Sequence, residues 1–464
     1  MHAKRTLAVT AASAAVALGS VAAAGLTAMP AHAAGTVTSV TLPLSGFSHL
    51  VLDPAHQHVF ISSAASNEML VTDYSGNTVA TIANEPGADG LVLSSDGNTV
   101  YAALSTGDAV SAISTSTLTE TARYSTGTGT QDDPVDLAYT GGKVWFSYGT
   151  GWNGGIGTVD PSTSPATVSL YTIGVTGTWY GAPILAAAPN GALVAGAANQ
   201  SPVQLTSFNV SCGCADELAK ATLSYPKYTS TASNLHDLAI TPDGNDVVVA
   251  SGAPYVHQIL QVSNLAQVGQ YTTGAYPTAV SIASDGTVAA GSDGVGVSLF
   301  APGGSSPLAS YTFGSSVIPA GGVAITPDAS EMVVVSGVDT PYDTWAPTLN
   351  IVTDPVQGPS TLSVTGPATD NKDAAITLTG TLGGAAPYAG GQTLHVTRTD
   401  PTNPNGVALP DVTTAADGTF TITDTPPKAN VDSATVTYQV SYAGDGHLTS
   451  STASASVTVH YNNS

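Results

Sequence analysis

Imidazole and carboxylate side chains recur at equivalent positions in this sequence, one or two residues before short hydrophobic segments. The five residues are His49, Asp89, Asp136, His236 and Asp237. Brought together, such groups can hold a divalent cation or transfer protons. The structural alternative is that they are solvated or accept hydrogen bonds from backbone amides. A metal ion therefore stays an open question, with His49, Asp136, His236 and Asp237 as its candidate ligands and all five as candidate ligand-binding residues.

Aromatic side chains in loop-like segments form a second candidate site. Trp152, Trp179 and Trp345 lie in stretches rich in glycine and proline. Exposed rings of this kind suit the apolar faces of sugars, whereas a buried ring would only pack against its own sheet. Trp179 and Trp345 are therefore further candidate ligand-binding residues.

Other histidines and motifs give weaker indications. His56, His58 and His257 are secondary candidates, and His56 and His58 fall in a segment that predicts a surface turn. The sequence has no H-E-x-x-H, G-x-S-x-G, phosphate-binding glycine loop or EF-hand motif. Their absence weakens an enzymatic interpretation without excluding it, because a site assembled from separate strands leaves no local motif.

The elements that position these side chains belong to a repeat. Each unit predicts an alternating strand, a turn that is often Asp-Gly, and a second strand. The units begin 41 to 53 residues apart, at Leu50, Leu91, Leu137, Leu185, Leu238, Val280 and Val323. Because one four-stranded blade occupies about 40 to 50 residues, the repeat predicts an all-β, seven-bladed β-propeller over residues 35–355.

The two ends of the propeller region complete each other. The last unit has no fourth strand before the composition changes, while Thr36–Leu44 forms a strand with no unit of its own. We expect this strand to close the ring as the outer strand of the last blade, since closure removes unpaired edges. The five polar residues would then surround the mouth of the central channel, with His236 and Asp237 across the ring from His49.

The repeats resemble those of a known family. The segments YPTAVSIASDG and LAITPDGNDVVVA resemble the YVTN-type propeller repeats of secreted and surface-layer proteins, which are similar to lactonase-like propellers. The resemblance covers about residues 35–355 and rests on structural motifs. It implies a non-catalytic binding, adhesion or scaffold protein that uses the channel face. The alternative it implies is a divalent-cation-dependent hydrolase or lyase with its site at the channel mouth.

A second domain follows a linker at 356–360. Residues 361–464 predict about seven strands, and segments such as ADGTFTITDTPP resemble bacterial immunoglobulin-like domains. The region has no cysteine pair, so alternating apolar residues must form its core. The resemblance implies an immunoglobulin-like β-sandwich that acts as a spacer or an adhesive module.

The first residues predict export. Lys4 and Arg5 precede an apolar stretch that ends in Ala31-His32-Ala33, the pattern of a secretory signal peptide over residues 1–33. We therefore expect a secreted, extracellular protein without membrane insertion. In an oxidising compartment Cys212 and Cys214 are expected to form a disulfide, which Gly213 makes feasible and whose tiny loop stabilises the fold little.

Charge excludes one class of partner. Without Lys4 and Arg5 the chain has seven basic and 32 acidic residues, a formal charge of 7 − 32 = −25. Nucleic acids and anionic bilayers need clustered positive charge, which this chain lacks. The expected partners are an extracellular glycan, a protein or a small molecule.

Overall fold

The computed structural model describes residues 35–461, except 128, 130–131, 174–178, 212–214, 226–229, 314–316 and 338–346. The signal peptide expected at 1–33, the pair Cys212 and Cys214, and Trp345 lie outside the described residues. No helix in the described part of the chain is long and apolar enough to cross a membrane.

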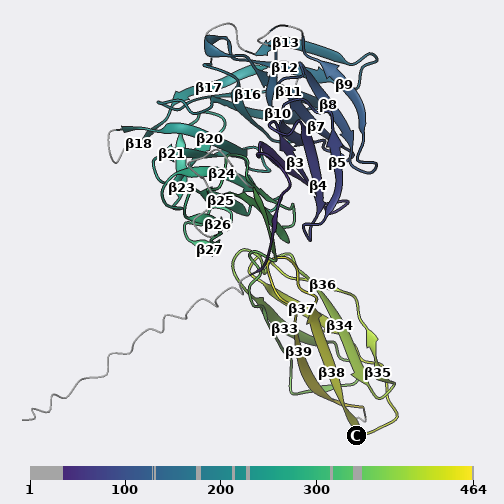
Figure 1. The fold of residues 1–464 in the computed structure, drawn as a ribbon. Helices are drawn as coiled ribbons and strands as arrows, with labels where there is room; N and C mark the ends of the chain where they lie inside the picture. The colour runs from purple at the N-terminus through teal and green to yellow at the C-terminus, as the bar shows by residue number, and fades with distance from the viewer. Residues whose placement is uncertain are drawn as a thin grey trace, which may run out of the picture.

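The chain forms a seven-bladed β-propeller followed by a β-sandwich (Figure 1). Each blade is a sheet of four antiparallel strands, ordered from the channel outward. The first three blades contain β2 (His49–Asp53), β3 (His58–Ser63), β4 (Glu68–Asp73) and β5 (Thr78–Ala83); β6 (Ala88–Leu93), β7 (Thr99–Leu104), β8 (Ala109–Ser114) and β9 (Glu120–Ser125); and β10 (Pro134–Thr140), β11 (Lys143–Tyr148), β12 (Gly155–Asp160) and β13 (Thr167–Ile173).

The next three blades repeat this order. They contain β14 (Pro183–Ala187), β15 (Ala192–Ala197), β16 (Gln204–Asn209) and β17 (Asp216–Thr222); β20 (Ser233–Ile240), β21 (Asp246–Ala253), β22 (His257–Gln261) and β23 (Gln267–Tyr271); and β24 (Pro277–Ile282), β25 (Val288–Ser292), β26 (Gly296–Phe300) and β27 (Pro307–Tyr311). The short turn η1 (Gly151–Asn153) and a two-stranded ribbon of β18 (Ser224–Tyr225) and β19 (Ser230–Thr231) lie in connections.

The seventh blade joins the two ends of the ring. Its sheet has the order β1 (Thr36–Thr41), β30 (Thr348–Thr353), β29 (Glu331–Ser336), β28 (Val323–Ile325). β1 runs antiparallel to β30, with Thr36 opposite Thr353 and Thr41 opposite Thr348. The strand is shorter than the segment to Leu44 that the sequence predicts, because Leu42 and Leu44 leave the sheet and are buried in the core. The N-terminal segment therefore gives this blade its outer strand.

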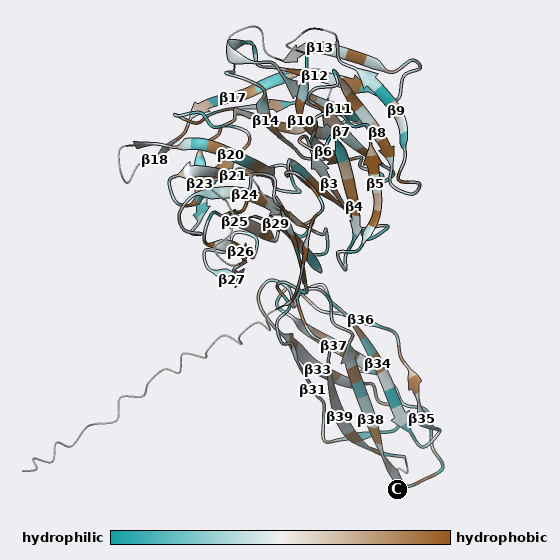
Figure 2. Ribbon diagram, viewed as in Figure 1, coloured by the Kyte–Doolittle hydropathy of each residue, from teal (hydrophilic) through white to brown (hydrophobic). Residues whose placement is uncertain are grey.

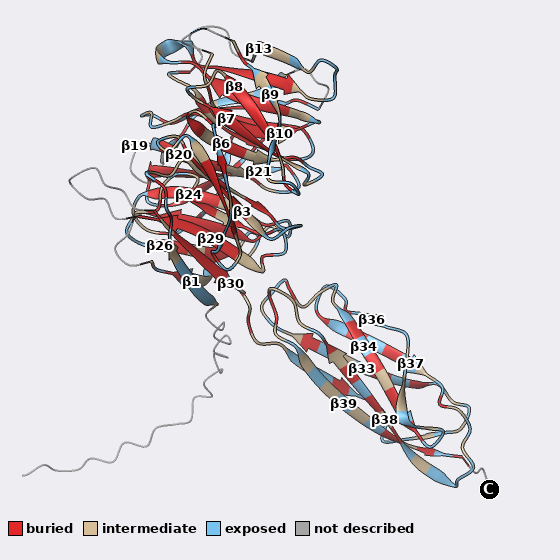
Figure 3. Ribbon diagram, turned by 45° about the vertical axis from the view of Figure 1, so that its right-hand side comes forward, coloured by how far each residue is buried: buried red, intermediate tan, exposed pale blue. Residues whose placement is uncertain are grey.

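The core of the propeller lies between blades. One cluster packs Phe60 and Met69 of the first blade against Leu91 and Val100 of the second. Figure 2 shows hydrophobic stretches along blade strands such as β8, and Figure 3 shows that the strands near the channel are mostly buried. Apolar burial therefore holds neighbouring blades together face to face.

The C-terminal region is a sandwich of two sheets, of three and six strands. The smaller sheet has the order β31, β33, β37, and the larger has β32, β39, β38, β34, β35 with β36 paired to β34. Their bounds are β31 (Thr361–Thr365), β32 (Thr369–Asn371), β33 (Ile376–Gly383), β34 (Thr393–Asp400), β35 (Asn403–Ala408), β36 (Val412–Thr413), β37 (Thr419–Asp424), β38 (Ser433–Tyr442) and β39 (Ser451–His460). Residues such as Leu378, Val396 and Tyr438 form the core.

The sandwich contacts the sixth blade directly. The Tyr388 hydroxyl lies 2.9 Å from the Thr287 hydroxyl, and His447 Nε2 lies 2.9 Å from Asp285 Oδ2. The rings of Tyr388 and His447 stack with centroids 4.0 Å apart. The junction is therefore a specific polar contact as well as a covalent linker.

Candidate functional site

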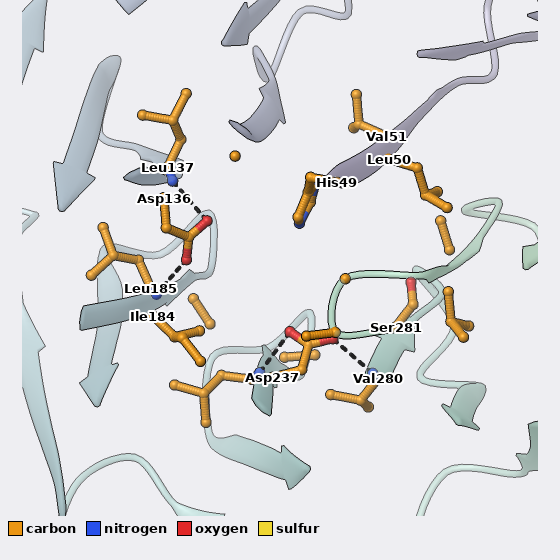
Figure 4. Close-up of a pocket in the computed structure, with 18 of the residues that line it drawn as sticks. His49, Leu50, Val51, Asp136, Leu137, Ile184, Leu185, Asp237, Val280 and Ser281 are labelled. Carbon is orange, nitrogen blue, oxygen red and sulfur yellow. Dashed lines mark hydrogen bonds between the residues drawn. The ribbon is translucent and has the colours of Figure 1, made fainter. Parts of the chain in front are cut away.

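A cavity of about 640 Å³ occupies the centre of the ring (Figure 4). Residues of all seven inner strands line it, from β2 to β28. It extends from the beginning of these strands, where His49 and Asp89 lie, to their ends, where Leu52 and Ile325 lie. The five polar residues predicted at the channel mouth all line this cavity.

Asp136 connects the third and fourth blades. Its Oδ1 accepts a hydrogen bond of 2.8 Å from the amide of Leu137, and its Oδ2 accepts one of 2.8 Å from the amide of Leu185 in the next blade. The pairing of β10 with β11 shifts register between Pro134 and Leu137, and such a bulge re-aims side chains. Both carboxylate oxygens thus accept backbone amides, and the bond to Leu185 links the two blades.

Asp237 makes the same connection between the fifth and sixth blades. It accepts hydrogen bonds of 2.8 Å from the amide of Leu238 and 2.9 Å from the amide of Val280 (Figure 4). A register shift lies between Leu235 and Asp237 as well. Asp136 and Asp237 therefore accept hydrogen bonds from backbone amides, as the structural alternative predicts.

The environment of both aspartates raises their pKa. Burial raises the pKa of Asp136 to about 6, although the amides of Leu185 and Leu137 oppose it. Burial likewise raises the pKa of Asp237 to about 7 against the hydrogen bonds from Val280 and Leu238. Both groups therefore titrate closer to neutral pH than an ordinary aspartate does.

Two serines that no sequence motif singles out connect other blades. The Ser281 hydroxyl accepts a hydrogen bond of 3.2 Å from the amide of Ile325, and the Ser62 hydroxyl donates one of 2.6 Å to the carbonyl of Asp89. Neither contact has a local signature in the sequence, since each partner lies in another repeat. Interblade hydrogen bonding is thus spread over several residue types.

Asp89 differs from the two bridging aspartates. Its carboxyl group makes no hydrogen bond to another described residue, and it faces the cavity. Burial, and secondarily the charge of Asp136, raise its pKa to about 7. The neighbouring Gly90 packs so closely on the third blade that a Cβ there would lie 2.7 Å from Asp136 Cα. Blade contact at Gly90 therefore positions an unpaired carboxyl in the channel wall.

The two histidines of the channel are held neutral. Burial lowers the pKa of His49 to about 4, and its Nδ1 is buried without a hydrogen-bond partner in the described structure. Burial also lowers the pKa of His236, while the charge of Asp293 opposes this. His236 makes no hydrogen bond to another described residue, so its ring is free to meet a ligand.

The candidate aromatic residues separate into buried and exposed rings. Trp179 is only 3% exposed and packs edge-on against Phe208, so it is not the surface ring that its loop composition suggested. Its neighbour Tyr180 is exposed and contacts the exposed Trp152, with centroids 5.3 Å apart. Sequence composition did not distinguish these rings, because all of them lie in similar glycine-rich segments.

Two of the secondary histidines, His257 and His56, have structural partners. His257 is fully buried, with Nδ1 2.8 Å from the Thr273 hydroxyl and Nε2 3.1 Å from the Ala279 carbonyl. His56 Nδ1 lies 2.7 Å from the buried Asp53 carboxylate, which also accepts a hydrogen bond from the His56 amide in the same turn. These groups stabilise the core and a blade turn.

The described residues do not form a metal centre. Within these ranges no group of three or more His, Cys, Asp or Glu side chains is arranged to hold a metal ion. The candidate ligands His49, Asp136, His236 and Asp237 therefore do not fit a divalent cation here, and two of them already accept amide hydrogen bonds.

Comparisons with known proteins identify the fold alone. No family model and no curated protein matches the sequence. The WD40 repeats of RRP9 are 12% identical with a TM-score of 0.52, covering 70% of this chain and 99% of that one. The structure of U3-55K is 10% identical with a TM-score of 0.51, covering 68% of this chain and 98% of that one.

One further similar structure extends past the propeller. PorZ of Porphyromonas gingivalis, described as an essential bacterial surface component of the type-IX secretion system, is 14% identical with a TM-score of 0.50. The match covers 89% of this chain and 59% of that one. At these identities the comparisons establish a β-propeller and leave its function to be argued from the site.

Proposed function

We propose that this protein is a secreted, non-catalytic binding or scaffold protein whose propeller takes up a positively charged group of its ligand at the channel mouth. The observation that carries the proposal is a difference in hydrogen bonding among the three aspartates of the channel. The carboxylates of Asp136 and Asp237 accept amide hydrogen bonds from the next blade. The carboxyl group of Asp89 faces the same cavity without a hydrogen-bond partner in the described structure.

The electrostatics of the channel favour a cation. Asp89 lies close enough to Asp136 for that charge to raise its pKa, and burial raises it further. A bound ammonium or guanidinium group would supply the missing partner and stabilise the ionised carboxylate. His236 is held neutral and can donate or accept a hydrogen bond beside it. A lysine or arginine side chain of a partner protein has this chemistry.

The proposal also includes export of the protein, the role of its repeats and the role of its C-terminal sandwich. The N-terminal pattern at residues 1–33 supports export. The YVTN-type resemblance of the repeats supports a binding or scaffold role. The resemblance of residues 361–464 to immunoglobulin-like domains, together with their two-sheet arrangement, supports a module that holds the propeller away from a surface or docks it.

Peptide binding tests the proposal. The probes are short unstructured peptides identical except for one central Lys, Ser or Glu, titrated into the mature protein, Asp89→Asn and Glu217→Gln. Glu217 lies exposed on the outer strand β17, so its variant removes one negative charge away from the channel. We expect selective binding of the lysine peptide, weakened about tenfold by Asp89→Asn only, as the loss of a charge-assisted hydrogen bond predicts.

The pH dependence supplies a second readout. Binding of the lysine peptide should strengthen from pH 6 to pH 8, because Asp89 ionises near pH 7. Equal binding of the three peptides, no binding at millimolar concentration, or equal affinity of Asp89→Asn and the parent protein would each contradict the proposal.

A further inference from the structure

Four aromatic side chains are exposed among the residues whose exposure the structure describes. Trp152 is 67% exposed, Tyr180 47%, Tyr255 51% and Tyr276 52%. They form two contacting pairs, Trp152 with Tyr180 at 5.3 Å between centroids and Tyr255 with Tyr276 at 5.2 Å. Exposed rings that gather in pairs are unusual on a chain with few aromatic residues, and such groups mark binding sites.

The two pairs occupy equivalent places in the propeller. Trp152 lies between β11 and β12 of the third blade, and Tyr180 lies in the connection that leads to β14 of the fourth. Tyr255 lies between β21 and β22 of the fifth blade, and Tyr276 directly precedes β24 of the sixth. Each pair therefore joins the second connection of one blade to the entry of the next.

Antiparallel topology places both pairs on one face. Connections between second and third strands lie at the end of the blade where the inner strand begins, as do the connections between blades. The inner strands begin at the channel mouth, where His49 and Asp89 lie. Both aromatic pairs are thus on the face that carries the channel mouth, displaced outward from it.

The rings are held in place by the backbone beneath them. The amide of Gly181 donates a hydrogen bond of 2.6 Å to the carbonyl of Gly151, and Gly154 donates one of 3.2 Å to Trp179, whose ring is anchored in the core. In the second pair, Tyr276 adopts a left-handed φ of 52°, a conformation that costs energy for a tyrosine. A preorganised ring loses little entropy on binding.

A small cavity of about 140 Å³ lies beside the first pair. Gln200, Ser201, Gln204 and Lys220 line it together with Trp152 and Tyr180. The side chains of Gln204 and Lys220 make no hydrogen bond or ion pair with another described residue. The cavity therefore combines an aromatic face with amide and ammonium groups that can donate hydrogen bonds to a ligand. Lys220 is one of only nine lysine and arginine residues in the chain.

We propose that these aromatic pairs are saccharide-binding sites, with the cavity beside Trp152 and Tyr180 as the better-formed one. A sugar ring has an apolar C–H face that packs on an aromatic ring, and a rim of hydroxyl groups that accept from ammonium and amide N–H groups. Gln204 and Lys220 supply these donors. Two equivalent sites on one face suit consecutive segments of one long glycan, whose affinity then exceeds that of a single site.

The size of the site argues against a folded protein as its occupant. A specific protein interface buries about 1,200–2,000 Å² in total and needs a continuous surface. Here the exposed rings form separate pairs on different blades, and the cavity between Trp152 and Lys220 admits only a small group. The site is separate from the channel, so the inference does not depend on the cation proposed there.

Glycan binding tests the inference. The mature protein is screened against an array of defined oligosaccharides, and the affinity for the best soluble oligosaccharide is measured for variants. We expect Trp152→Ala and Lys220→Met each to weaken binding about tenfold or more, and Trp152→Tyr to restore much of it. Leu218→Ala is the control, because it removes an exposed apolar side chain that lies outside the cavity.

Chain length and a channel variant separate the possible results. A longer oligosaccharide should lose more affinity than a disaccharide when Tyr276→Ala removes the second site, while Asp89→Asn should leave glycan binding unchanged. Absence of any retained glycan, or full affinity in the double variant Trp152→Ala, Tyr276→Ala with native circular dichroism, would overturn the inference. A protein ligand that is lost in Trp152→Ala while no glycan binds would also overturn it.

Discussion

The carboxylate of Asp136 accepts the amide hydrogen of Leu185 at 2.8 Å, and this bond joins two blades whose residues are 49 positions apart. The same carboxylate accepts the amide of Leu137, so one side chain is the acceptor for an amide in each of two neighbouring inner strands. Both amides lie at the wall of the channel, and the pairing of β10 with β11 shifts register just before Leu137.

Removing this bridge should destabilise the propeller. Asp136→Ala leaves the amides of Leu137 and Leu185 without their acceptor, and a buried unsatisfied group costs roughly 1–3 kcal/mol. We expect the free energy of unfolding to fall by about that amount, as measured by urea denaturation. The control Glu217→Ala changes an exposed residue and should alter stability by less than about 0.5 kcal/mol. Equal stability of the two variants would show that the bridge is dispensable.

The raised pKa of Asp237 predicts a loss of stability as pH rises. An aspartate in the unfolded chain ionises near pH 4, whereas burial raises the pKa of Asp237 in the folded protein to about 7. Between these values the folded state binds more protons than the unfolded state, so stability decreases from about pH 4 to pH 7. Asp237→Asn should flatten this dependence in thermal unfolding measured across that range. An unchanged slope would mean that Asp237 is ionised throughout.

Local chemistry explains why the blades could be predicted from sequence. In the turn that begins the second strand of blade two, Asp96 Oδ1 accepts the amide of Asn98, and Gly97 adopts a positive φ of 72°. Such turns need aspartate and glycine at fixed positions, so their recurrence indicates the repeat. The pairing of the N-terminal strand with the last blade could be predicted because the last repeat lacks its fourth strand and the N-terminal segment forms a strand outside any repeat.

Contacts between distant repeats explain what the sequence did not reveal. Asp89 and Asp136 both precede a hydrophobic strand, yet of these two only Asp136 accepts a hydrogen bond from an amide of the next blade. Trp152 and Trp179 lie in similar loops, yet of these two rings only Trp179 packs against Phe208. Partners of this kind are set by packing in three dimensions and leave no pattern along the chain.

The closing strand should protect the propeller from aggregation. β1 pairs along its whole length with β30, and the amide of Gly35 donates a hydrogen bond of 2.9 Å to the Tyr311 hydroxyl. Deleting residues 35–41 would expose the hydrogen-bonding edge of β30, and an open edge pairs with other chains. We expect this variant to unfold at lower temperature and to form oligomers in light scattering, whereas deletion of 1–34 should give a monomer. A monomeric 35–41 deletion with the parent melting temperature would contradict this role.

A buried charge network should control the stability of the sandwich. Arg398 Nε lies 2.7 Å from Asp400 Oδ2, and its Nη1 lies 2.8 Å from Asp424 Oδ1, with the guanidinium almost fully buried. Arg398→Met leaves two carboxylates without their cation, and breaking a buried pair typically costs about 3–5 kcal/mol. Calorimetry should show that the sandwich unfolds at a lower temperature in this variant than in the parent protein.

An exposed ion pair in the same domain provides the comparison. Lys428 Nζ lies 3.4 Å from Asp373, and both side chains are more than half exposed. Lys428→Met should change stability by less than about 1 kcal/mol, since water screens such pairs. If Lys428→Met and Arg398→Met had equal effects, burial would not be what gives the Arg398 network its importance.

The contact between His447 and Asp285 should couple the sandwich to the propeller. Burial alone would raise the pKa of Asp285, but hydrogen bonds from His447 and Thr287 lower it below the usual value. Because the folded pKa lies below the unfolded one, this contribution is present at neutral pH and is lost as pH falls through the lowered pKa. His447→Ala removes both the contact with Asp285 and the ring stacked on Tyr388, so we expect it to weaken docking by about 1–2 kcal/mol.

Small-angle scattering and calorimetry can measure this coupling. At neutral pH the parent protein should give a narrow distribution of distances between the two domains, and His447→Ala should broaden it and separate the two unfolding transitions. The matched control is His395→Ala, because His395 lies 2.8 Å from Asp411 within the sandwich, and both side chains are more than half exposed. Broadening that is equal in the two variants, or absent in both, would show that the linker and apolar contacts alone hold the domains together.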